Sequence, residues 1–279
     1  MAVTAVELGT VAVKAAIERS GIAPENSRRI PGRQLIPTGI SLETYNAVLD
    51  KIDHIYSAEI AAEKSGVLAI ERLWASEKVN AYALRSGLRR IIVFPGGLAR
   101  HPEIDRDAFA LVACHEIGHH RGGAPIRARN TWASVEGQAD YFANLKCMRR
   151  FFEDEDNEVV MKNPKLDELT RGECEKEFSS RNDQLACMRS VVAAKGVTMM
   201  LRDLAGETTV PDVATPDAHI ADATNQSYPG TQCRIDTFLN AARCPVPTSE
   251  GVSPLRYQDG TCDQSPYNTG SRPQCWFKR

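Results

Sequence analysis

A short stretch with two histidines one helical turn apart constrains this chain more than any other feature. Residues 113–120 read A-C-H-E-I-G-H-H and contain the pattern H-E-x-x-H at His115, Glu116 and His119. On a helix, positions i and i+4 differ by about 40° of rotation, so both imidazoles project from one face. Two imidazole nitrogens so placed can bind one zinc ion, with Glu116 beside a metal-bound water. The pattern therefore predicts a helix that turns one polar face toward an ion.

A second acidic pattern supplies the missing ligand. Glu136 lies 17 residues after His119, and Asp140 follows it at i+4, so the two carboxylates share one helical face. One carboxylate can bind zinc, and the other can accept the free N–H of a ligating histidine. The separation leaves a loop long enough for this helix to fold back on the first, and Gly118 and Gly137 suit close packing. We expect Glu136 to be the third ligand and Asp140 its orienting partner.

The competing interpretation of both patterns is a solvated helix face with unrelated histidines and acids. The apolar residues of the first helix and the available third ligand favour the metal site. His120 lies about 100° from His119 around the helix, so we expect it to be a structural or cleft residue. The remaining histidines are isolated in the sequence, and we expect no site role for them: His54, His101 and His219.

These residues resemble the gluzincin metallopeptidases, in which H-E-x-x-H is followed by E-x-x-x-D on the next helix. Upstream, residues 79–83 (V-N-A-Y-A), 91–94 and 96–98 (G-G-L) are similar to the segment before the active helix in HtpX-like and CAAX-prenyl-protease-like zinc peptidases. The resemblance covers about residues 67–146. It implies a zincin-like metallopeptidase core with an edge strand that aligns extended peptide, and it marks Asn80 and Ala81 as substrate-binding residues.

A weaker similarity lies near the C-terminal end. Residues 228–235 (Y-P-G-T-Q-C-R-I) resemble the family's T-H-P-x-x-x-x-R segment, with Tyr228 in place of the histidine and Arg234 retained. A phenol can still donate a hydrogen bond to a developing oxyanion. The resemblance therefore implies that Tyr228 and Arg234 are catalytic stabilisers.

Together the patterns predict a zinc-dependent endopeptidase with one Zn²⁺ per chain. Its metal ligands would be His115, His119 and Glu136, with Glu116 as general base and then proton donor to the leaving amine. Two alternatives remain open. One is a metal-binding, non-hydrolytic envelope protein that uses the peptidase fold to bind a partner. The other is a proenzyme whose own tail fills the cleft.

Charge and hydropathy exclude several other classes of protein. Of 279 residues, 42% are hydrophobic and 25% are charged, and 34 Lys and Arg nearly balance 36 Asp and Glu. The net charge of −2, without a basic block, argues against a nucleic-acid partner. No stretch approaches the roughly 18 apolar residues of a membrane span. The expected partner is therefore a polypeptide substrate.

Cysteine usage points to an oxidising compartment. No two of the eight cysteines form C-x-x-C, and the last four fall within a segment of 43 residues rich in Pro, Gly, Ser and Asn. This is typical of a disulfide-stapled tail, so we expect a periplasmic or secreted protein. Because residues 1–23 do not read as a signal peptide, we expect a mature or trimmed chain whose signal peptide is missing. We expect one bridge among Cys147, Cys174 and Cys187, and Cys114 as a small buried residue.

Hydrophobic periodicity predicts an α+β fold with a small antiparallel or mixed sheet. The expected helices are 2–20, 41–64, 104–120, 131–151, 166–178, 183–204 and 233–242; the expected strands are 67–74, 79–84 and 90–94. We divide the chain into an N-terminal helix and loop (1–40), a gluzincin-like catalytic domain (41–232) and a cysteine-rich tail packed on the core (233–279).

Overall fold

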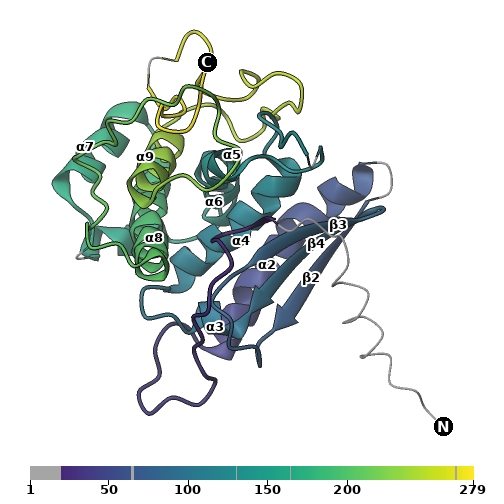
Figure 1. Ribbon diagram of the computed structural model, residues 1–279. Helices are drawn as coiled ribbons and strands as arrows, with labels where there is room; N and C mark the ends of the chain where they lie inside the picture. The colour runs from purple at the N-terminus through teal and green to yellow at the C-terminus, as the bar shows by residue number, and fades with distance from the viewer. Residues whose placement is uncertain (1–19, 64–65, 130, 164, 268) are drawn as a thin grey trace.

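The structure, a computed structural model, describes residues 20–63, 66–129, 131–163, 165–267 and 269–279. A small sheet and helix α2 (Leu42–Ala62) form one side of the molecule, and most of the other helices and the C-terminal loops form the other side (Figure 1). The α+β class predicted from periodicity is confirmed. The helix predicted over residues 2–20 lies outside the described residues, except for Ser20, which is extended.

Among the described residues the sheet is mixed, as expected, but it has four strands where three were predicted, because Ser20–Gly21 adds to it. Its order is β1-β3-β4-β2, with β4 parallel to β2 and antiparallel to β3, and with β1 antiparallel to β3. The strands are β1 (Ser20–Gly21), β2 (Val67–Leu73), β3 (Tyr82–Ser86) and β4 (Arg89–Pro95). Gly87 adopts a positive φ of 56° in the tight turn between β3 and β4, a conformation that favours glycine. The strand predicted over residues 79–84 begins three residues later than expected, at Tyr82.

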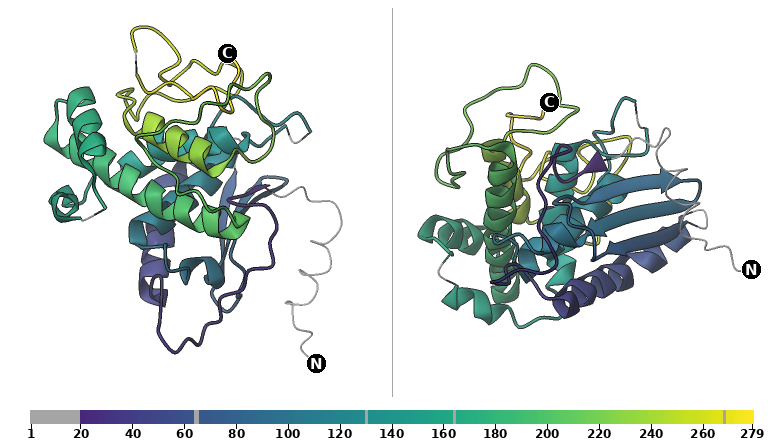
Figure 2. Two further views of the ribbon diagram at one scale, coloured as in Figure 1. Left: turned by 60° about the vertical axis from the view of Figure 1, so that its left-hand side comes forward. Right: turned by 60° about the horizontal axis from the view of Figure 1, so that its bottom comes forward.

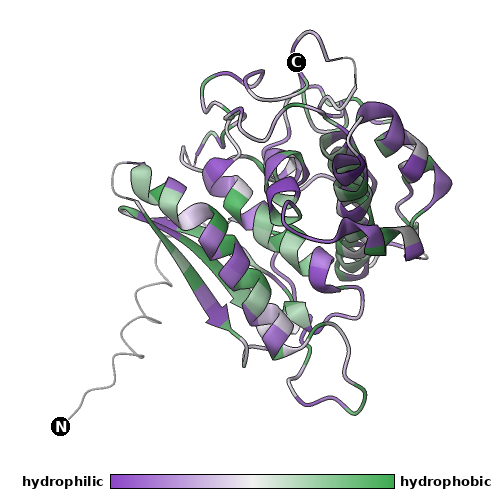
Figure 3. Cartoon of the chain, turned by 180° about the vertical axis from the view of Figure 1, so that it is seen from behind, coloured by the Kyte–Doolittle hydropathy of each residue, from purple (hydrophilic) through white to green (hydrophobic). Residues whose placement is uncertain are grey.

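Helix α2 (Leu42–Ala62) covers one side of the sheet and confirms the helix predicted over 41–64. Ser41 caps it, because its hydroxyl accepts the Thr44 N–H at 3.1 Å. Its buried side chains recur at helical spacing and face the core: Tyr45, Val48, Leu49, Ile52, Tyr56 and Ile60. Its outward side mixes hydrophilic residues with alanines (Figure 3).

Helix α4 (Arg106–Arg121) is the central element of the molecule and contacts α2, α5 and α8 (Figure 2). Every residue from Ala108 to His119 is buried. The other helical elements are α3 (Gly96–Ala99), α5 (Glu136–Phe142), the π-helix η1 (Ala143–Cys147), α6 (Met148–Phe151), the 3₁₀-helix η2 (Asn157–Lys162), α7 (Glu168–Glu177), α8 (Arg181–Ala205) and α9 (Thr231–Ala242). None of the helices described here is long and apolar enough to cross a bilayer.

The helix predicted to begin at residue 131 begins five residues later. Val135 is extended, and Ser134 instead forms an isolated antiparallel bridge with Ile126. The Ser134 N–H donates to the His119 carbonyl at 3.0 Å, so this loop is tied to the end of α4. Tertiary hydrogen bonds therefore override the local helical pattern at these residues.

Two small residues permit two different close contacts. A Cβ atom on Gly118 would lie 2.7 Å from the Ala139 carbonyl oxygen, so α4 and α5 cross closely at this point, as expected. Gly137 packs instead against the ring of Trp276, from the C-terminal tail. The tail also reaches α5 through Arg272, which donates to the Gln138 side chain at 2.6 Å.

All eight cysteines are paired, so Cys114 is buried as expected but is also part of a disulfide that was not predicted. Cys114 on α4 is bridged to Cys147, so a disulfide joins the H-E-x-x-H helix to the π-helix η1 that follows α5. Closing such a 33-residue separation contributes about 3–4 kcal/mol in the chain-entropy description. The other bridges are Cys174–Cys187, Cys233–Cys275 and Cys244–Cys262. The last two staple the tail, as predicted.

Candidate metal centre

The structure brings the three predicted ligands together at the crossing of α4 and α5. The two Nε2 atoms of His115 and His119 lie 3.1 Å apart. The Glu136 carboxylate lies 3.2 Å from Nε2 of His115 and 3.7 Å from Nε2 of His119. One ligand atom from each residue falls within 4.8 Å of the others, and the three side chains have no exposed surface.

The other nitrogen of each imidazole is held by an oxygen acceptor. Nδ1 of His115 donates to Asp140 at 2.7 Å, and Nδ1 of His119 donates to the Ser134 carbonyl at 2.9 Å. Each Nδ1–H so engaged leaves the Nε2 lone pair facing the centre of the cluster. Two lone pairs and a carboxylate that face one another require a proton or a metal cation between them. Asp140 therefore occupies the orienting position predicted for it.

The pKa values of the two imidazoles shift in opposite directions. Burial alone would lower the pKa of His115, but the Asp140 and Glu136 carboxylates outweigh it and raise this pKa to about 9. Burial lowers the pKa of His119 to about 3. Burial also acts on Glu136, but the neighbouring His119 and His115 hold its pKa below its usual range. The cluster therefore favours one positive charge at its centre.

Glu116 is a buried carboxylate without a hydrogen-bond partner. Neither of its oxygens has one among the described residues, and the side chain has no exposed surface. Burial, and next the charge of Glu136, raises its pKa to about 8, although His115 opposes this shift. Burying a carboxylate without a hydrogen-bond donor lowers the stability of the fold, so such a group points to a functional role. A His₂Glu donor set with a free carboxylate beside it fits the ligand chemistry of catalytic zinc.

Two further contacts to Glu136 were not predicted from the sequence. The Arg127 guanidinium forms an ion pair with Oε1 of Glu136, and the Ser20 hydroxyl donates to the same oxygen at 3.4 Å. Arg127 is one of two arginines in the loop between α4 and α5, and Ser20 lies 116 residues from Glu136. Neither position carries a signal in the sequence that distinguishes it from its neighbours.

Arg234 reaches the cluster from α9 but acts on Asp140. Its Nε and Nη2 atoms donate to both Asp140 oxygens at 2.7 and 2.6 Å, and its Nη1 donates to the Ile22 carbonyl at 2.5 Å. Burial would raise the pKa of Asp140, but Arg234 and His115 hold it below its usual range. This geometry makes Arg234 the residue that fixes the partner of His115.

Tyr228 lies near the cluster but at its margin. The side chain is half-buried, and burial together with the charges of Glu136 and Glu116 raises the pKa of its phenol. Tyr228 and Arg234 both line a cavity of about 320 Å³, whose wall also includes residues 23–26. Its predicted role as an oxyanion donor stays a prediction.

Asn80 and Ala81 precede β3 and are buried against the N-terminal segment of the chain. The Asn80 side chain bonds to both backbone groups of Ala23, and the Ala81 carbonyl accepts the Ile22 N–H. The two residues predicted to bind a peptide substrate therefore hold a peptide segment of the chain itself.

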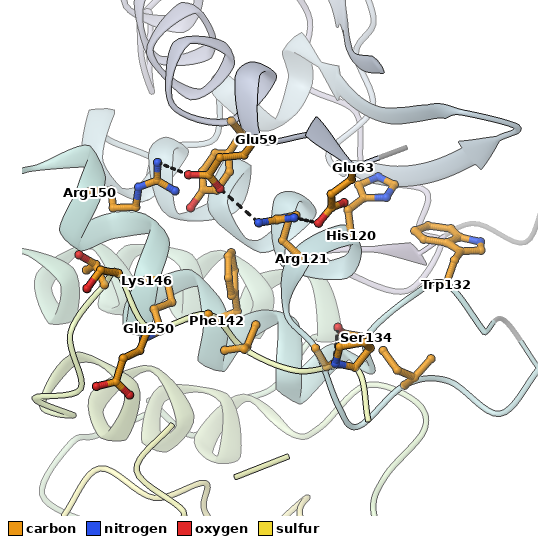
Figure 4. A pocket seen from close by; sticks show the side chains of 18 of the residues that line it. Glu59, Glu63, His120, Arg121, Trp132, Ser134, Phe142, Lys146, Arg150 and Glu250 are labelled. Atoms are coloured by element: carbon orange, nitrogen blue, oxygen red, sulfur yellow. Dashed lines mark hydrogen bonds and ion pairs between the residues drawn. The ribbon is translucent and has the colours of Figure 1, made fainter. Parts of the chain in front are cut away.

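A larger cavity, of about 700 Å³, lies beside α4 and is lined by His120 (Figure 4). The His120 ring stacks on Trp132 with ring centroids 4.8 Å apart, and its Nε2 donates to the Ile91 carbonyl at 3.3 Å. The prediction that His120 is a cleft residue outside the metal cluster is confirmed. The wall mixes acids and bases, with Arg121 and Arg150 paired to Glu59.

No family model, no characterised protein and no solved structure matches this chain. The function must therefore be argued from the geometry of the cluster and the chemistry of its residues.

Proposed function

We propose that this protein is a zinc-dependent endopeptidase of the gluzincin type, similar to the HtpX-like and CAAX-prenyl-protease-like peptidases. The observation that carries the proposal is the fully buried His115–His119–Glu136 cluster with the unpartnered carboxylate of Glu116 beside it. Three protein ligands leave a fourth position for water, which is the composition of catalytic rather than structural zinc sites.

Each residue of the cluster has a distinct task in this mechanism. His115, His119 and Glu136 would hold the zinc ion, which would supply an activated water and a Lewis acid for the substrate carbonyl. Glu116 would accept a proton on its carboxylate and deliver it to the leaving amine. Asp140 and the Ser134 carbonyl keep both imidazoles oriented.

The substrate would bind as an extended polypeptide along residues 80–83, which present backbone groups and the Asn80 carboxamide. Tyr228, at the margin of the cluster, would donate its hydroxyl to the developing oxyanion. The four disulfides fit an oxidising compartment, so we place the protein in the periplasm or outside the cell.

The alternative is a metal-binding envelope protein without hydrolytic activity. Glu116 argues against it, because a binder has no use for a buried, unpaired carboxylate that costs stability. The two proposals agree on the metal and differ only in the chemistry at Glu116.

Metal content and hydrolysis, measured on the same preparations, test the proposal. The wild-type protein should contain about one zinc per chain and should cleave a disordered polypeptide, either as the intact chain or after limited proteolysis. His119→Ala should lose both properties, whereas His219→Ala, at an exposed position, should keep both. Full zinc occupancy in His119→Ala would refute the ligand assignment, and a zinc-loaded wild type that cleaves no peptide, even after limited proteolysis, would favour the binder.

A further inference from the structure

The segment from Ser20 to Ala23 lies along β3 as an added strand. Ser20 is opposite Ala83 and Gly21 is opposite Tyr82, in antiparallel register. The Ile22 N–H continues the ladder and donates to the Ala81 carbonyl at 3.3 Å. This is the geometry by which a foreign extended peptide adds to the edge of a sheet.

Side-chain contacts fit this segment closely to the sheet. The Asn80 carboxamide accepts the Ala23 N–H at 3.3 Å and donates to the Ala23 carbonyl at 3.0 Å, so it satisfies both backbone groups of one residue. A Cβ atom on Gly21 would lie only 2.6 Å from the Ala81 carbonyl oxygen. The strand therefore depends on a glycine at this position.

The same segment contacts the metal cluster. The Ile22 carbonyl accepts from Arg234 at 2.5 Å, and the Ser20 hydroxyl donates to Glu136 at 3.4 Å. Ser20 and Ile22 have no exposed surface, and β1 packs against α4. In Figure 1 the dark purple segment crosses α4 between the sheet and α8 before it descends to the bottom of the molecule.

These contacts place a strand of the chain where a substrate would have to lie. The cluster residues have no exposed surface, so a polypeptide can reach Glu116 only after covering residues move. We propose that Ser20–Ala23 is an inhibitory segment that fills the peptide groove and keeps the folded protein latent. This inference rests on the proposed peptidase function. The occupant is the N-terminal segment, whereas the proenzyme expected from the sequence used its C-terminal tail.

A single glycine offers a way to loosen the segment without altering the cluster. Gly21→Ala places a methyl group against the Ala81 carbonyl, so β1 must shift away from β3. Gly32→Ala is the matched control, since a Cβ on Gly32 meets nothing within 4 Å. Hydrolysis of a disordered polypeptide should rise about tenfold or more in Gly21→Ala, because a minor open state is populated at about 0.1–10% before release. Gly32→Ala should match the wild type.

A second form of the protein removes the risk that Gly21→Ala simply misfolds. A recognition sequence for a site-specific protease, inserted after the exposed Gly32, lets the chain fold intact before the segment is cut and washed away. A fluorescent peptide with the sequence of residues 20–26 (S-G-I-A-P-E-N) then reports on the groove without any catalysis. It should bind the cut protein and inhibit its hydrolysis of the polypeptide, and it should not bind the intact protein. A scrambled peptide should neither bind nor inhibit the cut protein.

The two measurements separate the inference from the function beneath it. Peptide binding confined to the cut form, together with faster hydrolysis, supports both. Peptide binding confined to the cut form without hydrolysis in any form supports the inhibitory position of the segment and refutes the peptidase. Equal hydrolysis by the intact and cut proteins, with no binding of the peptide to either, overturns the inference and leaves the peptidase standing.

Discussion

Two charged clusters in this molecule, one fully buried and one partly exposed, use the same kinds of residue in different ways. The first is the candidate metal cluster of His115, His119 and Glu136, with Glu116 beside it, at the crossing of α4 and α5. The second, which we name the α4–α8 ion network, consists of Lys51, Arg106, Asp107, Glu155 and Arg189. Arg189 donates to both Asp107 oxygens at 2.9 and 3.0 Å and contacts Glu155 at 3.0 Å. Glu155 also accepts from Arg106 at 2.6 Å and from Lys51 at 2.8 Å.

The difference lies in which atoms are left without partners. In the α4–α8 ion network each carboxylate oxygen accepts from a cation, so the charges are compensated within the protein. In the metal cluster, both Glu116 oxygens lack a hydrogen-bond donor and two imidazole nitrogens face each other. A complete network contributes to stability, whereas buried polar groups left without partners around a common centre are a candidate site for a ligand. Removing one charge should therefore lower activity in the first cluster and lower the free energy of unfolding in the second.

The largest expected effect is on catalysis, in Glu116→Gln. The amide retains size and polarity but cannot accept the proton, so peptide hydrolysis should fall by a factor of about 10²–10⁴. Zinc content and the midpoint of thermal unfolding should change little, because neither Glu116 oxygen lies within hydrogen-bond distance of a donor in the described residues.

Glu136→Gln is the control, since an amide is a poor zinc ligand and the zinc content itself should fall. Hydrolysis by Glu116→Gln at the wild-type rate would show that Glu116 is not the base.

The corresponding change in the α4–α8 ion network should affect stability. Arg189 is 4% exposed, and Arg189→Met leaves Asp107 and Glu155 with fewer cations, so the free energy of unfolding should fall by about 3 kcal/mol. Urea unfolding measures this loss, and zinc content should stay at the wild-type level.

Arg28→Met is the matched control, because Arg28 and Asp203 pair at 3.7 Å on the surface with about half of each side chain exposed. The free energy of unfolding of Arg28→Met should lie less than about 1 kcal/mol below that of the wild type. An equal loss in both variants would contradict the distinction between the two pairs.

The smallest expected effect is a dependence of stability on pH. Burial would raise the pKa of Glu155, but Arg106 and Lys51 lower it from the ordinary 4.5 to about 2. A depressed carboxylate pKa stabilises the fold above the unfolded pKa, and this contribution is lost as the pH falls from about 4.5 toward 2. Glu155→Gln should therefore cost about 2 kcal/mol of unfolding free energy at pH 6, and the difference from the wild type should shrink by pH 3.

Urea unfolding at the two pH values tests this prediction. Glu168→Gln serves as the control, because the Glu168 side chain is 92% exposed and should contribute almost nothing at either pH. A difference between Glu155→Gln and the wild type that stays constant from pH 6 to pH 3 would contradict the assigned origin of the shift.

Much of the metal cluster was predictable, because its core depends on local helical geometry. The i, i+4 spacing alone places His115 with His119, and Glu136 with Asp140, on shared faces. Helix α2 with its Ser41 cap and the strands of the sheet were also predictable, because local hydrophobic periodicity and capping depend on neighbouring residues. The start of α5 was predicted wrongly, because the hydrogen bonds of Ser134 extend over the tertiary structure and outweigh local propensity.

The sequence by itself therefore determined which residues can share a helical face and which could supply a zinc ligand. Only the tertiary structure decided that Asp140 meets His115, that Cys114 is bridged to Cys147, and that Arg234 binds an aspartate 94 residues away. It also brought Ile22 to Arg234 across 212 residues of chain, and with it a strand over the cluster. The physical reason is that helical periodicity repeats every 3.6 residues, whereas contacts between distant segments depend on how the loops turn and how the core packs.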